Sequence, residues 1–220
     1  NIANIFLVLS LPALLVPLQA GGHGQGRALT AMLIATAVWT GITTIMPLTV
    51  MTGFLFLLIL IGYCGFTFLQ ARRGGLVLGA NLIIAGGVGV AEFYGVPQEW
   101  IGLTLLAIGT SLPEVGAAIA AALRKKGEVA IGNVLGSNIF NILGAGGIIS
   151  LFGPIQVAPT FRQYDHWAMA LAAVLVGSFI LTRARIGRLA GILMLLIYAV
   201  YIYGLINGFS ILGLFQGAPA

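Results

Sequence analysis

Residues 100–123 read WIGLTLLAIGTSLPEVGAAIAAAL, and Glu114 carries the only charge among them. A run of this length lets one helix cross the hydrocarbon core of a bilayer, which is roughly 30 Å thick. A carboxylate near the middle of such a helix costs roughly 2.5 kcal/mol or more, and acids in this position are functional by default. The stretch therefore predicts a membrane helix that carries a polar site.

The composition of the whole chain also fits a lipid environment. Its 220 residues are 60% hydrophobic and 7% charged, with a mean hydropathy of +1.09. Soluble domains carry about 25% charged residues, so this chain has too few polar groups to cover a globule in water. The 32 glycines indicate close contact between helices. The single cysteine excludes an internal disulfide, and the scattered basic residues argue against a nucleic-acid partner.

Eight apolar runs come close to the length of a membrane span, and their lack of strict alternation favours helices over a barrel. They are residues 2–18, 28–46, 50–69, 76–94, 100–123, 129–152, 166–182 and 188–208. No basic segment precedes the first run, and Asn1 is not a start methionine, so we expect the chain to begin within a longer protein. The prediction is an all-α polytopic membrane protein with a short tail at 210–220.

The basic residues distinguish the two sides of such a protein. If all eight runs span, nine Lys and Arg residues fall on one side and only Arg162 falls on the other. The nine are Arg27, Arg72, Arg73, Arg124, Lys125, Lys126, Arg183, Arg185 and Arg188. The positive-inside rule assigns the side with nine to the cytoplasm, which leaves the C-terminus outside.

The chain also repeats itself at a nearly constant separation. NIANI at 1–5 returns as NIFNI at 138–142, and GFLFLLI at 53–59 returns as GILMLLI at 191–197. Pro17 with Pro154 and Gln19 with Gln156 have the same separation as Asn1 and Asn138. One unit then holds five helices, and an odd number of spans inverts the second copy, as in many secondary transporters. We divide the chain into 1–70, the end of a first repeat, and 71–209, a second repeat.

Oxygen-bearing side chains gather in two of the runs. Thr110 and Glu114 are four residues apart, as are Ser137 and Asn141, so each pair shares one helix face. Hydroxyl, amide and carboxylate oxygens are hard ligands that suit Ca²⁺ or Na⁺. Since no Lys or Arg lies inside a span, a mobile cation or a proton is the natural partner of Glu114; the structural alternative is a protonated, hydrogen-bonded Glu.

Pro113 adds backbone ligands to this set. Proline lacks an N–H group and frees the carbonyl four residues earlier, at Gly109, and we expect the carbonyls of Ala107 and Thr110 to loosen as well. Freed carbonyl oxygens are further ligands of the kind that hard cations prefer.

The strings GTSLPE at 109–114 and GNVLGSNIFN at 132–141 resemble the second alpha-repeat of the calcium/cation antiporter superfamily, the sodium/calcium exchanger-like membrane proteins. NIANIFLVL at 1–9 resembles the end of that family's first alpha-repeat. The resemblance implies a ten-helix, 5+5 inverted-repeat fold of which this chain carries about eight helices. It also implies a central site at the midplane where the two repeats bind Ca²⁺ and, in exchange, Na⁺ or H⁺.

The resemblance also implies a ligand set. Carried onto matching positions, the ligands are Glu114, Thr110, Ser111, Ser137, Asn141 and Asn4, with the backbone carbonyl of Ala107. Some exchangers have an Asp where this chain has Asn141, so Glu114 is the one acid expected at the site. We expect this chain to be inactive in transport without the missing first-repeat helices as a partner. Its short loops favour a prokaryotic plasma membrane.

Two other classes of function compete with transport. One is a non-transporting membrane scaffold or ion sensor that keeps the repeat fold. The other is an intramembrane hydrolase acting through Ser111 or Ser137, which lacks a nearby general base. No sequence motif of an enzyme or cofactor site is present, so we expect a transporter without a resident cofactor. Asp165 and His166 are expected to lie in the wet aromatic belt of the membrane surface.

Overall fold

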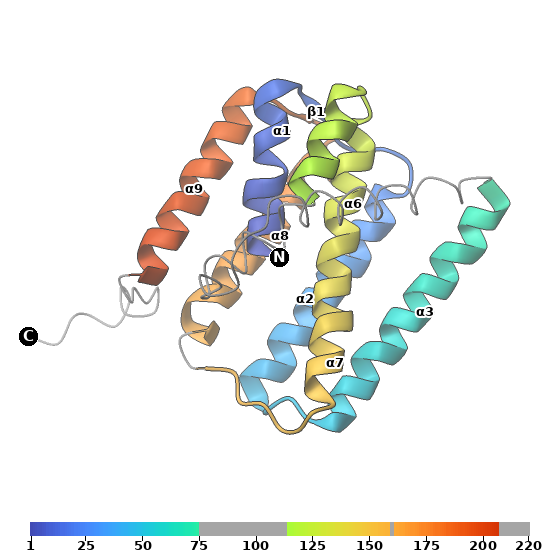
Figure 1. The fold of residues 1–220 in the computed structure, drawn as a ribbon, viewed down its shortest axis with the longest axis vertical. Helices are drawn as coiled ribbons and strands as arrows, with labels where there is room; N and C mark the ends of the chain where they lie inside the picture. Colours follow the sequence, from blue (N-terminus) through green and yellow to red (C-terminus); the bar gives the residue numbers. More distant parts are fainter. Residues whose placement is uncertain (75–113, 159–160, 207–220) are drawn as a thin grey trace, which may run out of the picture.

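The structure is a computed structural model that describes residues 1–74, 114–158 and 161–206. These residues form a bundle of helices, drawn in Figure 1, with two very short strands. The predicted run at 76–94, most of the run at 100–123 and the tail at 210–220 lie outside the described residues.

The helices follow the predicted apolar runs closely. The first part of the chain contains η1 (Asn4–Val8), α1 (Ser10–Leu15), β1 (Leu18–Gln19), α2 (Gln25–Ile45) and α3 (Val50–Gly74). After the helix Glu114–Leu123 come α6 (Gly127–Phe140), η3 (Asn141–Ala145) and α7 (Gly146–Ser150). The chain continues with η4 (Phe161–Asp165), α8 (His166–Leu181), β2 (Arg185–Ile186) and α9 (Arg188–Ile206). The segments named η are π-helical.

Four helical stretches among the described residues are long and apolar enough to cross a membrane. They are Gln25–Ile45, Val50–Thr67, Gly127–Ser150 and Arg188–Leu205. Three shorter apolar helices, Asn4–Leu15, Glu114–Leu123 and His166–Leu181, lie within other predicted spans. Large apolar side chains face outward along these helices; Leu58 and Ile61 on α3 are each 68% exposed. The prediction of an all-α polytopic membrane protein is confirmed, whereas the total of eight spans stays a prediction.

Equivalent parts of the two predicted repeats have the same helix geometry. The π-helix η1 begins at Asn4 and the π-helix η3 begins at Asn141, its counterpart in the repeated sequence. Each leads into a short α-helix, α1 or α7. A π-turn inserts one extra residue into a helical turn and is often found at functional sites. The repeated sequence NIANI/NIFNI thus marks the same local distortion in both halves.

Helix packing repeats in the same way. A Cβ atom on Gly53 of α3 would lie 2.7 Å from the carbonyl oxygen of Gly147 on α7. A Cβ atom on Gly191 of α9 would lie 3.0 Å from the carbonyl oxygen of Ser10 on α1. In the alignment of the two repeats, Gly191 corresponds to Gly53 and Gly147 corresponds to Ser10. A glycine therefore lets α3 approach α7, and its counterpart lets α9 approach α1, through equivalent contacts.

Two short antiparallel pairings join the halves at opposite ends of α2. Leu18 of β1 pairs with Ile186 of β2 just before α2 begins, and Leu48 pairs with Ile155 just after α2 ends. In the second pair the two backbones exchange N–H···O bonds of 2.9 and 2.8 Å. Ile155 is the repeat counterpart of Leu18, and Ile186 is that of Leu48, so each pairing is the counterpart of the other. This crossed arrangement is what an inverted repeat predicts.

The centre of the bundle forms around the N-terminal segment. Phe6, Val8 and Leu9 are almost fully buried, and η1 contacts α1, α6, α8 and α9. Ile131 and Leu135 of α6 are buried in the same core. The polar residue at the start of η1, Asn4, is therefore placed inside the bundle, where its side chain must find polar partners.

Candidate cation site

A chain of hydrogen bonds links η1, α6 and the helix Glu114–Leu123. The Nδ2 atom of Asn4 donates to Ser137 Oγ at 3.2 Å and to Asn138 Oδ1 at 3.0 Å. Ser137 Oγ in turn donates to Glu114 Oε1 at 3.3 Å. Asn4 belongs to the first predicted repeat and Ser137 to the second, so this cluster joins the two repeats.

The cluster is buried and contains one carboxyl group. Asn4 is 3% exposed and Asn138 is 1% exposed, while Glu114 and Ser137 are half-buried. The second carboxyl oxygen of Glu114, Oε2, is buried and has no hydrogen-bond partner among the described residues. A buried polar atom without a partner costs about 1–3 kcal/mol. A bound cation would give this oxygen a partner, whereas a proton would remove the buried charge.

The chemistry of the cluster suits a hard cation. Carboxyl, hydroxyl and amide oxygens are the ligand types that Ca²⁺ and Na⁺ take. Within the described residues there is no group of three or more His, Cys, Asp or Glu side chains that could hold a metal ion. Among the described residues, Glu114 is the acidic member of the cluster, and its neighbours there are a hydroxyl and two amides.

The structure brings together three of the predicted ligands. Glu114, Ser137 and Asn4 lie in the hydrogen-bonded cluster. Asn141 is the first residue of η3 and is exposed. Among the described residues, it forms none of the hydrogen bonds named above for this cluster. Thr110, Ser111 and Ala107 lie outside the described residues, so their place in the site stays a prediction.

Asn138 is a member of the cluster that the sequence pattern did not single out. Its Oδ1 atom accepts a hydrogen bond from Asn4, and its Nδ2 atom donates to the Met32 sulfur of α2 at 3.5 Å. The four-residue spacing drew attention to Ser137 and Asn141 instead. The repeated sequence carried a signal, because Asn138 and Asn141 both have asparagine counterparts, at Asn1 and Asn4.

The expectation for Asp165 and His166 is wrong, because both side chains are buried, each with 6% exposure. Asp165 accepts a hydrogen bond from the Tyr201 hydroxyl of α9, and His166 Nε2 lies 3.1 Å from Thr43 Oγ1 of α2. Burial raises the pKa of the Asp165 carboxyl above its ordinary value. These residues fasten the start of α8 to α9 and α2 instead of facing water.

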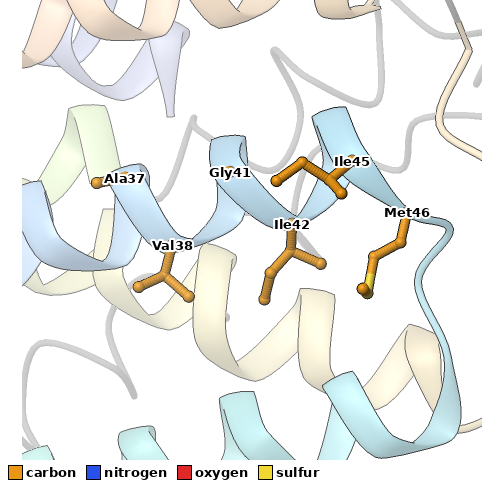
Figure 2. A pocket seen from close by; sticks show the side chains of 6 residues that line it. All are labelled: Ala37, Val38, Gly41, Ile42, Ile45 and Met46. Carbon is orange, nitrogen blue, oxygen red and sulfur yellow. The ribbon is translucent and has the colours of Figure 1, made fainter.

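A hollow on the outer side of α2 is an unsuitable cation site. Figure 2 shows the side chains that line it, all of them apolar or glycine: Ala37, Val38, Gly41, Ile42, Ile45 and Met46. Such a surface offers no ligand oxygen from a side chain and suits hydrocarbon. The hydrogen-bonded cluster around Glu114 is therefore the better candidate for cation binding.

The described helices form a polytopic helical membrane protein, and the hydrogen-bonded cluster around Glu114 contains residues of both predicted repeats. The model of the family described as sodium/calcium exchanger protein matches residues 74–207. The chain belongs to this family of membrane antiporters. The resemblance predicted from the sequence motifs is thereby confirmed.

Individual relatives agree with this assignment. A relative from Alkalimonas amylolytica is 32% identical over 238 residues, which cover 92% of this chain and 75% of the relative. The sodium/calcium exchanger MaX1 of Methanosarcina acetivorans is 35% identical over 127 residues, which cover 58% of this chain and 36% of MaX1. A structure of the sodium-calcium exchanger NCX_Mj matches with a TM-score of 0.66 and 30% identity, over 93% of this chain and 73% of NCX_Mj.

Proposed function

We propose that the protein exchanges Ca²⁺ for Na⁺ or H⁺ across a membrane, at a midplane site shared by the two repeats. The observation that carries this proposal is the buried Oε2 atom of Glu114, which lacks a partner among the described residues and lies beside a hydroxyl and two amides. A carboxylate in this setting attracts a cation, and no basic side chain is predicted within the spans to neutralise it.

Competition for one carboxylate would couple the two ion fluxes. Occupancy of Glu114 by one cation excludes the other, and each bound form can favour a different arrangement of the repeats. Asn4 belongs to the first repeat, whereas Glu114 and Ser137 belong to the second. A movement of one repeat against the other would therefore change the ligand set around the ion.

The proposal includes further ligands and a partner. Thr110, Ser111, Asn141 and the carbonyl of Ala107 would complete the coordination in the whole site, together with the first-repeat helices that precede Asn1 in a complete exchanger. The division at 1–70 and 71–209 is part of the proposal and is supported by the paired π-helices and glycine contacts. Without the first-repeat helices we expect no transport. No resident cofactor takes part.

We also propose an orientation in the membrane. The basic residues at the end of the bundle that holds β1 and β2 would face the cytoplasm of a prokaryotic cell, with the C-terminus outside. The one basic residue expected on the other side is Arg162.

The test is exchange by the full-length protein in sealed lipid vesicles. Glu114→Gln keeps the size of the side chain and removes its charge, and we expect it to abolish Ca²⁺ uptake driven by a Na⁺ or pH gradient. Glu128→Gln is the matched control, because Glu128 is an exposed acid in the first turn of α6, and this variant should transport normally. Retained exchange in Glu114→Gln would contradict the proposal.

The same experiment separates transport from an ion-sensing scaffold. A scaffold would bind Ca²⁺ with the same dependence on Glu114, but the vesicles would show no gradient-driven uptake. Running the flux measurement with a Na⁺ gradient alone and with a pH gradient alone identifies the coupling ion.

A further inference from the structure

Two helices end in the same motif with an unusual residue at its key position. After Glu114–Leu123, Lys125 N donates to Ala122 O and Lys126 N donates to Ala121 O, each at 2.8 Å. After α8, Arg183 N donates to Ile180 O and Ala184 N donates to Phe179 O in the same pattern. This is the Schellman motif, whose left-handed residue is usually glycine because it has no Cβ atom.

In both motifs the left-handed residue is basic. Lys125 has φ +58° and Arg183 has φ +53°, and these are the two non-glycine residues with positive φ in the described part of the chain. The sequence contains 32 glycines, so glycine is far from rare in this protein. The left-handed conformation disfavours residues that have a Cβ atom. Lys and Arg at these two positions therefore indicate that their positive charge has a function there.

The two basic turns are held together by β1. Gly127, which follows Lys126, lies so close to β1 that a Cβ atom on it would be 2.9 Å from Leu18 Cα. On the other side, the Gln19 amide donates to the Arg183 carbonyl at 2.9 Å and accepts from Arg185 Nε at 3.0 Å. The two turns therefore form one surface at the upper end of the bundle in Figure 1, and we call it the basic end.

The basic end carries a strong excess of positive charge. Its exposed basic residues, from the start of α2 to the start of α9, are Arg27, Arg124, Lys125, Lys126, Arg183, Arg185 and Arg188. Glu128 is the acidic residue exposed at the same end among the described residues. A surface of this kind attracts anionic groups.

The exposed leucines beside these basic residues indicate which kind of anion the basic residues contact. Leu123, Leu181 and Leu189 adjoin the basic turns and are 62%, 76% and 72% exposed. Exposed leucines on a membrane helix contact lipid chains, so the neighbouring Lys and Arg side chains lie at the depth of the lipid headgroups.

We propose that the basic end is a binding surface for anionic phospholipids, with Lys125 and Arg183 directed to their phosphate groups. The positive-inside rule accounts for which end is basic. It does not account for Lys and Arg at the two positions where glycine would be favoured. The proposal goes beyond cation exchange and does not depend on the role of Glu114.

The test compares binding of short-chain phosphatidylglycerol and phosphatidylcholine to the full-length protein in detergent, by titration calorimetry. The double variant Lys125→Gly/Arg183→Gly removes two charges and gives both turns the residue that their backbone favours. We expect it to fold with unchanged or higher thermal stability, and to bind phosphatidylglycerol more weakly by about fivefold for each charge removed. Phosphatidylcholine binding should change little.

Two further variants keep the test decisive. Lys125→Arg/Arg183→Lys preserves both charges and should preserve the preference for phosphatidylglycerol. Arg162→Gln removes a charge from η4, at the other end of α8, and should have no effect on lipid preference. If the double-glycine variant bound phosphatidylglycerol as tightly as the wild type, the proposal would be overturned. Equal loss in Arg162→Gln would overturn it as well.

Discussion

Asn138 connects the candidate cation site with the helix beside it. Its side chain accepts from Asn4 on one side and donates to the Met32 sulfur on the other, and all three residues are almost fully buried. Asn4 is held from two directions, by Ser137 and by Asn138. Asn138 thus fixes the position of a proposed ligand without being selected as a ligand itself.

Replacing Asn138 should therefore remove one of the two hydrogen bonds that hold the Asn4 side chain. We expect Asn138→Ala to lower the free energy of unfolding by about 1–3 kcal/mol, because a buried N–H group of Asn4 loses its acceptor. Asn141→Ala changes an exposed asparagine on the following turn and should alter the unfolding free energy by less than about 0.5 kcal/mol. Denaturant unfolding in detergent measures both. Equal losses in the two variants would show that the Asn4–Asn138 hydrogen bond has no special role in stability.

At the scale of elements, α3 with α7 and α9 with α1 are two versions of one helix pair. In each pair a glycine faces a backbone carbonyl at a distance that leaves no room for a side chain. Only small residues allow such close approach between membrane helices.

A methyl group at these positions should push the helices apart. We expect Gly53→Ala and Gly191→Ala each to destabilise the protein by about 1–3 kcal/mol, with the larger effect at Gly53, where the new carbon would lie at 2.7 Å instead of 3.0 Å from the carbonyl oxygen. Gly62→Ala is the control on α3, since a Cβ atom there would have nothing within 4 Å. Thermal unfolding in detergent gives the comparison. A neutral Gly53→Ala would mean that α3 and α7 do not pack as described.

The positions of the long helices were largely predictable from the sequence, because long apolar runs determine where membrane helices form. The predicted runs 28–46 and 50–69 correspond to Gln25–Ile45 and Val50–Gly74. The π-helix that starts at Asn141 was not predictable, since one extra residue within a single five-residue turn shifts the hydrophobic pattern too little to be recognised. β1 and β2 are each too short for any alternation to be recognised.

The candidate site was predictable in part for a similar reason. Glu114 stands out because a charge in an apolar run is rare, Ser137 follows from helical spacing, and Asn4 was expected only from the resemblance to the antiporter family. The choice between Asn138 and Asn141 depends on how far α6 turns around its axis relative to η1. That rotation is set by packing between segments far apart in the sequence, which spacing along one helix does not encode.

At the scale of the molecule, the two halves are joined through the crossed pairings of Leu18 with Ile186 and Leu48 with Ile155. Each half contributes one of the two paired residues at each end of the bundle. The pairing is therefore reciprocal, and neither end belongs to one half alone.

Cysteine cross-linking tests this arrangement. In a Cys64→Ser background, Leu48→Cys/Ile155→Cys should form a disulfide under mild oxidation, since paired residues of this type have Cα atoms about 5.5 Å apart. The mismatched pair Leu18→Cys/Leu48→Cys joins residues at opposite ends of α2 and should stay reduced. Gel mobility before and after reduction distinguishes the two. A cross-link in the mismatched pair, or none in the matched pair, would contradict the reciprocal pairing.

The reciprocal pairing also has a consequence for biosynthesis. The ribosome makes Leu18 long before Ile186, so the β1 segment has no partner until nearly the whole second half has been inserted into the membrane. Leu48 is likewise made before its pairing partner Ile155. Neither pairing can form before its second-half segment has been made, so both ends of the bundle are completed late in synthesis.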